Sequence, residues 1–86
     1  MSVKIYFELQ EVATICTLPP EDINYFVVMS WIEPHDPEEN IFDNEDIARI
    51  QLIRDLRENM GVNDEAIPVI LHLIDQLNFI HRGENA

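Results

Sequence analysis

Carboxylate side chains dominate one long stretch of this chain, and a surface rich in carboxylates attracts cations. From Ile5 to Ala48 the sequence contains no lysine or arginine in 44 residues. The same stretch contains eleven acidic residues: Glu8, Glu11, Glu21, Asp22, Glu33, Asp36, Glu38, Glu39, Asp43, Glu45 and Asp46. Carboxylates can hold a metal ion, transfer protons in catalysis, or pair with the lysines and arginines of another molecule.

The first two kinds of chemistry lack the residue patterns they need. His35, Asp36, Glu38 and Glu39 would offer a metal one imidazole and three carboxylates, but their spacing matches no EF-hand loop. The chain has no Ser/His/Asp set and no glycine-rich phosphate loop, and it contains two glycines in all. We therefore expect no metal, no cofactor and no catalytic residues, and a protein that is not an enzyme.

The remaining chemistry is a docking surface for a basic partner. The net charge is −12, and seven of the fourteen residues from Glu33 to Asp46 are acidic. Complementary charge raises the association rate and selects the partner, whereas affinity also needs an apolar anchor. The sequence therefore predicts partner contacts from Asp36, Glu38, Glu39, Ile41, Asp43, Glu45 and Asp46. An interpretation that stays open is a solvated acidic loop that only prevents aggregation.

Short elements separated by strong turn signals must position these side chains. Apolar periodicity, prolines and capping residues mark their limits. The sequence predicts a strand at 3–7, helices at 9–16 and 20–29, a return strand at 41–42, and helices at 45–59 and from about 64 to 82. The result is one mainly α domain over residues 1–86. The turn around 36–40 belongs to a small hairpin, or wing, which forms a tiny sheet with the N-terminal strand.

The predicted helix at 45–59 begins among acidic side chains. Asp43, Glu45 and Asp46 lie at its N-terminus, where the positive end of the helix dipole accommodates them without a basic neighbour. We expect these carboxylates to be unpaired and available to a partner. Phe42, just before them, is expected to pack on the first strand rather than contact the partner.

The last helix is apolar around most of its circumference. A helix that lies on a small core buries a stripe of roughly 100° or somewhat more, and the apolar residues between 67 and 80 extend well beyond such a stripe. We expect one side to pack inward and another to form a homodimer interface that includes Ile70, Leu73, Leu77 and Ile80. A deeply embedded core helix is the alternative.

The ordered series of segments resembles the winged helix-turn-helix of the MerR-like group. The resemblance rests on residues 7–13, 18–26, 32–34, 42–50 and 56–63, in that order. A unit of this kind normally grips DNA, which requires lysine and arginine to displace counterions from phosphates. Because those residues are absent from residues 5–48, we expect this chain not to bind nucleic acid.

Within that group the chain is similar to the CbpM family of chaperone modulators. The likeness rests on Glu33-Pro34, Phe42-Asp43, Gln51, Leu56-Arg57 and the segment 67–77 with its Asp75. The resemblance implies a protein that binds the J domain of a DnaJ-like, CbpA-type co-chaperone and blocks its work with the Hsp70 chaperone. A J domain presents a basic helix to Hsp70, which suits an acidic competitor.

Two other functions stay open at this point. One is a MerR-like transcription regulator that binds DNA through residues 20–29 and the wing. The other is an acidic DNA mimic that inhibits a nucleic-acid-binding protein. No stretch approaches the roughly 20 apolar residues of a membrane span, and the first residues contain no apolar run of signal-peptide length. We expect a cytoplasmic protein that does not bind membranes.

Overall fold

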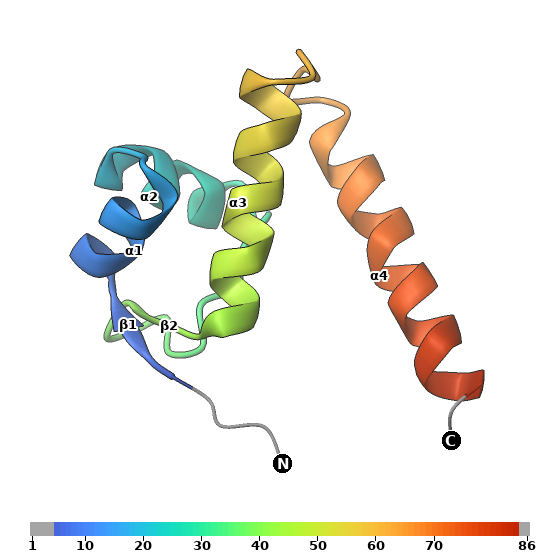
Figure 1. Ribbon diagram of the computed structural model, residues 1–86, viewed down its shortest axis with the longest axis horizontal. Helices are drawn as coiled ribbons and strands as arrows, with labels where there is room; N and C mark the ends of the chain where they lie inside the picture. The colour runs from blue at the N-terminus through green and yellow to red at the C-terminus, as the bar shows by residue number, and fades with distance from the viewer. Residues whose placement is uncertain (1–4, 85–86) are drawn as a thin grey trace.

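A computed structural model describes residues 5–84, with side chains described for residues 5–80. Within these residues the chain forms a helix-turn-helix, a small wing and two further helices (Figure 1). The elements follow the chain as β1 (Phe7–Glu8), α1 (Leu9–Cys16), α2 (Pro20–Val28), β2 (Ile41–Phe42), α3 (Asn44–Glu58) and α4 (Ile67–Glu84). The predicted order of elements is confirmed.

The sheet is smaller than predicted. β1 pairs antiparallel with β2 through Phe7↔Phe42 and Glu8↔Ile41, whereas the predicted strand covered residues 3–7. Residues 3 and 4 lie outside the described residues, and Ile5 and Tyr6 are exposed and not part of the strand. The reason is the length of β2, because Asp43 directly after it already caps α3 and leaves no partner strand for Ile5 and Tyr6.

The turn between α1 and α2 depends on backbone geometry and proline. Thr17 ends α1 in the left-handed region, with φ 55°, and its N–H bonds to the carbonyls of Ala13 and Thr14. Pro20 then occupies the first turn of α2, where its missing N–H costs nothing. Leu18 lies buried between the two helices and anchors the turn in the core.

The core lies among α1, α2, α3 and β2. Its largest fully buried side chains are aromatic: Phe26 of α2, Trp31 just after it, and Phe42 of β2. The rings of Phe26 and Trp31 lie 5.7 Å apart between centroids. Phe42 packs inside as predicted. Cys16 is also buried, and burial raises the pKa of its thiol, so it is a small apolar core residue.

α4 starts later than the predicted helix and covers little of the core. Residues 64–66 form a turn, so Pro68 lies in the first turn of α4 rather than deep inside a helix. Among the α4 side chains described, residues 67–80, only Ile67 and Leu71 are buried. Further along, α4 diverges from α3 (Figure 1). The embedded-core alternative is therefore wrong for the described part of this helix.

Candidate functional site

The acidic start of α3 is tied together by a reciprocal capping box. The Asp43 carboxylate accepts a hydrogen bond from the Asp46 N–H at 2.9 Å, and Asp46 Oδ2 accepts one from the Asp43 N–H at 3.0 Å. Asp46 Oδ2 also accepts the N–H of His35 at 3.0 Å, which fastens the wing to α3. The expectation that Asp43 is unpaired is wrong, because its carboxylate caps the helix and also lies 3.8 Å from His35 Nδ1. Asp46 is held by backbone N–H groups rather than by a basic side chain of the described residues.

The electrostatics at Asp46 favour an incoming cation. Burial raises the pKa of Asp46, the neighbouring charge of Asp43 adds to this, and the backbone hydrogen bonds oppose it. Asp46 makes no ion pair with a lysine or arginine among the described residues. Its carboxylate is therefore partly desolvated, and backbone N–H groups rather than a cationic side chain of the described residues stabilise its charge.

The wing is a tight turn built on Asp36. Its Oδ1 accepts the N–H groups of Glu38 and Glu39 at 3.1 and 3.2 Å, and its backbone pairs with Ile41 in both directions at 3.0 Å. Asn40 completes the turn with φ 54°. Asp36 thus shapes the turn, while Glu38 and Glu39 are exposed at its tip.

The predicted contact residues therefore separate into two kinds. Glu38, Glu39 and Glu45 are exposed, whereas Asp36, Ile41 and Asp46 are half-buried and Asp43 is buried. Glu45 and Asp46 lie together on the first turn of α3. Glu38 and Glu39 lie at the wing tip and do not line the groove described below.

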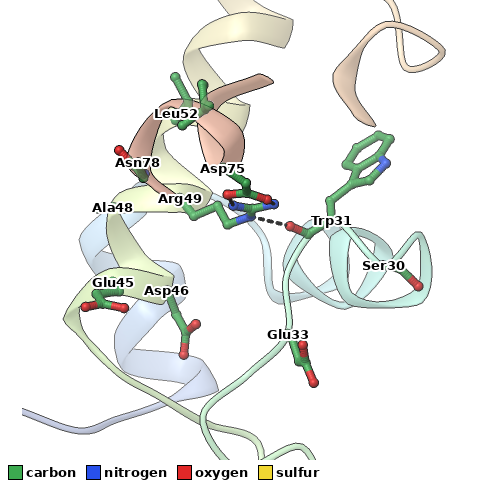
Figure 2. Close-up of a pocket in the computed structure, with 11 residues that line it drawn as sticks. Ser30, Trp31, Glu33, Glu45, Asp46, Ala48, Arg49, Leu52, Asp75 and Asn78 are labelled. Carbon is green, nitrogen blue, oxygen red and sulfur yellow. Dashed lines mark hydrogen bonds and ion pairs between the residues drawn. The ribbon is translucent and has the colours of Figure 1, made fainter. Parts of the chain in front are cut away.

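Arg49 joins three parts of the molecule. Its Nε donates to the Trp31 carbonyl at 2.7 Å, and its two terminal nitrogens donate to the Asp75 carboxylate at 2.8 and 3.2 Å (Figure 2). The guanidinium thereby links the exit of α2, α3 and α4, and it lowers the pKa of Asp75. No local sequence pattern marks this junction, because Arg49 is 18 residues from Trp31 and 26 residues from Asp75.

A groove of about 910 Å³ lies beside this junction, between α3 and α4. We call it the α3–α4 groove; its lining includes Glu33, Glu45, Asp46, Leu52, Ile74 and Asp75. Figure 2 shows Glu33, Glu45 and Asp46 gathered on one side of Arg49. The groove therefore combines an acidic rim with half-buried apolar side chains, Leu52 and Ile74.

The arginines of α3 are all engaged within the chain. Arg49 pairs with Asp75 at 2.8 Å, Arg54 with Glu58 at 2.9 Å, and Arg57 with Asp64 at 2.9 Å. Arg57 also lies over the Tyr25 and Phe26 rings, 5.6 and 5.4 Å from their centroids. Helix α2 contributes no cation, since its nine residues include neither lysine nor arginine.

A family model described as MerR HTH family regulatory protein matches residues 7–83. The chain belongs to this MerR family. The match spans the helix-turn-helix, the wing, α3 and nearly all of α4, and it confirms the predicted winged helix-turn-helix fold. No curated protein matches the chain.

The helix-turn-helix of this MerR family chain contains acidic residues and no lysine or arginine. Among the described residues, no group of three or more histidine, cysteine or carboxylate side chains is arranged to hold a metal ion. In the same part of the chain, no helix is long and apolar enough to span a membrane.

Proposed function

We propose that this MerR family chain is a non-catalytic regulator that binds the J domain of a DnaJ-like co-chaperone through its acidic surface. One observation carries the proposal: lysine and arginine are absent from residues 5–48, and the arginines of α3 are paired with carboxylates. The elements that would grip DNA therefore present negative charge. A basic helix on a protein fits that charge. The resemblance to the CbpM chaperone modulators suggests that the J domain is the protein that carries this helix.

The proposed mechanism is competition. A J domain uses its basic helix to engage Hsp70, so a bound acidic module keeps Hsp70 away from it. The exposed carboxylates raise the rate of encounter, and apolar contacts slow the dissociation. The chain itself needs no catalytic group for this, because occupying the helix is sufficient for inhibition.

Titration calorimetry with a purified J domain tests the proposal. We expect saturable binding at low salt that weakens as salt rises to about 0.5 M, where the screening length falls to a few Å. The same chain should suppress J-domain-stimulated ATP hydrolysis by Hsp70. Absence of binding at low salt would contradict the proposal.

The family match also favours a second candidate, a DNA-binding regulator. We expect no gel shift of random duplex DNA even at about 50 mM salt, because non-specific affinity comes mainly from neutralised phosphates. A shift under those conditions would favour this candidate over the J domain.

We also propose that the chain forms a homodimer through α4. Leu73, Leu77 and Ile80 are each more than half exposed on one side of the helix, and the half-buried Ile70 borders them. Each such side chain contributes roughly 1.5–3 kcal/mol when it becomes fully buried. Leu73→Lys combined with Ile80→Lys should yield monomers in sedimentation, with retained helical circular dichroism. An unmodified chain that sediments as a monomer at high concentration would contradict the dimer.

A further inference from the structure

We infer that the α3–α4 groove, rather than the wing tip, binds the partner's basic helix. The inference rests on the proposed function, since it locates the surface that the proposed partner occupies. The occupant is an amphipathic helix whose cationic side chains face Glu33, Glu45 and Asp46 and whose apolar side covers Leu52 and Ile74.

The shape of the groove suits a helix. Side chains of α3 and α4 line it, together with Ser30, Trp31 and Glu33 of the segment that leaves α2 (Figure 2). Its volume of about 910 Å³ is some three times that of the second hollow, about 310 Å³, which lies between α2 and the wing. An amphipathic helix that lies in a groove between helices is a recurrent mode of recognition.

The charge of the groove selects a basic occupant. Its lining contains four carboxylates, Glu33, Glu45, Asp46 and Asp75, and one arginine, Arg49, which gives a formal charge of −3. Arg49 is already held by Asp75 and the Trp31 carbonyl. The remaining three carboxylates can form ion pairs with lysines or arginines of the partner.

A second copy of this chain is the poorer occupant. Each copy carries a net charge of −12, so a second acidic chain would meet an acidic rim. The apolar side of α4 that we assign to the dimer carries Leu73, Leu77 and Ile80, none of which lines the groove. A dimer and an occupied groove are therefore compatible.

The wing tip has charge without an anchor. Glu38 and Glu39 are exposed there, but they do not line either hollow. Affinity at interfaces comes from buried apolar anchors, and exposed rim charges chiefly set the association rate. The groove has both components within one surface, through Glu45 on its rim and Leu52 inside it.

A matched pair of lysine substitutions on α3 tests the inference. Ala48 and Gln51 are both exposed on α3, but only Ala48 lines the groove. Ala48→Lys and Gln51→Lys add the same side chain and the same charge to the same helix. With the J domain in calorimetry, we expect Ala48→Lys to raise Kd about tenfold or more and Gln51→Lys to raise it less than about threefold.

A second pair separates the groove from the wing. Glu45→Lys reverses a charge on the groove rim, and Glu39→Lys reverses one at the wing tip. We expect the larger loss of J-domain binding from Glu45→Lys. Equal losses within either pair, or a larger loss from Glu39→Lys, would overturn the groove assignment while leaving the J domain as partner. Circular dichroism of each variant confirms that it folds.

A separate probe keeps the groove testable if the J domain does not bind. In that case the proposed function fails, and a synthetic Lys/Leu amphipathic helical peptide is titrated into the labelled chain by NMR. Saturable shifts at Ala48, Leu52 and Ile74, weaker in the Ala48→Lys variant, would support a groove for basic helices. Shifts confined to the wing, or no saturable shifts, would overturn it.

Discussion

The winged unit, residues 7–58, and α4 use apolar side chains in opposite ways. In the winged unit Phe26, Trp31 and Phe42 are almost completely buried, and each helix directs its apolar stripe into one core. In α4 the apolar side chains after Leu71, except the half-buried Ile74, are exposed; Phe79, for example, is 77% exposed. The described core therefore forms without them, and in our proposal the exposed side of α4 serves binding.

Two identical substitutions give the sharpest test of this contrast. Phe26 is 0% exposed and Phe79 is 77% exposed. Phe26→Ala should lower the free energy of unfolding by about 3–5 kcal/mol, because it removes a large side chain and leaves a cavity. Phe79→Ala should change it by less than about 0.5 kcal/mol.

Urea unfolding measures the free energy of unfolding of both variants. The two are compared at the same low protein concentration, because dilution keeps the contribution of any dimer small. The contrast between the winged unit and α4 is contradicted if Phe79→Ala proves as destabilising as Phe26→Ala. That result would mean that the outer part of α4 belongs to the folded core of the monomer.

A smaller effect is expected from the cap that consolidates the winged unit. Asp43→Ala removes the acceptor of the Asp46 N–H at the start of α3 and should cost about 1 kcal/mol. Glu45→Ala, two residues further on, removes an exposed carboxylate that makes no hydrogen bond among the described residues. It should cost no more than a few tenths of a kcal/mol through the helix dipole.

Thermal unfolding distinguishes the two alanine variants directly. Equal losses would mean that the carboxylates at this helix start act only through their charge, and that the capping geometry contributes nothing. The expected ranking also separates folding from binding, because Glu45 is the residue whose loss should affect the partner more than the fold.

The smallest effect concerns the junction between the two regions. Arg49 lowers the pKa of Asp75 in the folded chain. The Arg49–Asp75 pair therefore stabilises the fold at pH values above the unfolded pKa of Asp75, near 3.8. This stabilisation is lost as the pH falls through the lower pKa of the folded chain. The Asp75 side chain is 53% exposed and that of Arg49 is 30% exposed, so solvent screens the pair and its contribution is at most about 1 kcal/mol. Asp75→Asn should therefore lose slightly less stability than the unmodified chain on acidification.

The contribution of Asp46 to stability depends on pH in the opposite direction. Because burial raises its pKa, its contribution is greatest below the unfolded pKa and is lost as the pH rises through the higher folded value. Unfolding curves between about pH 1 and pH 7 for Asp75→Asn and the unmodified chain isolate the Asp75 contribution. Identical pH profiles would mean that the junction does not stabilise α4.

Local signals made most of the fold predictable from the sequence. Pro20 at the start of α2 and Asp43 at the start of α3 act within a few residues of themselves, so the predicted limits of α1, α2 and α3 lie within about one residue of those observed. The start of α4 was predicted about three residues too early. The length of β1 was not predictable in the same way, because it depends on how many residues β2 offers for pairing.

The candidate site was less predictable for two physical reasons. A capping carboxylate can also contact a partner, so the sequence marked Asp43 as a possible cap but could not show that Asp43 is buried while Glu45 is exposed. The α3–α4 groove depends on Arg49 meeting Asp75 across 26 residues, and no local pattern encodes that contact.

The central claim is that this member of a helix-turn-helix family binds a basic protein helix and not DNA. Calorimetric titration of the purified J domain into the chain at low salt, with random duplex DNA titrated under the same conditions, tests it most directly. The account predicts saturable, salt-sensitive heat from the J domain and none from the DNA. Saturable heat from the DNA with none from the J domain would contradict it.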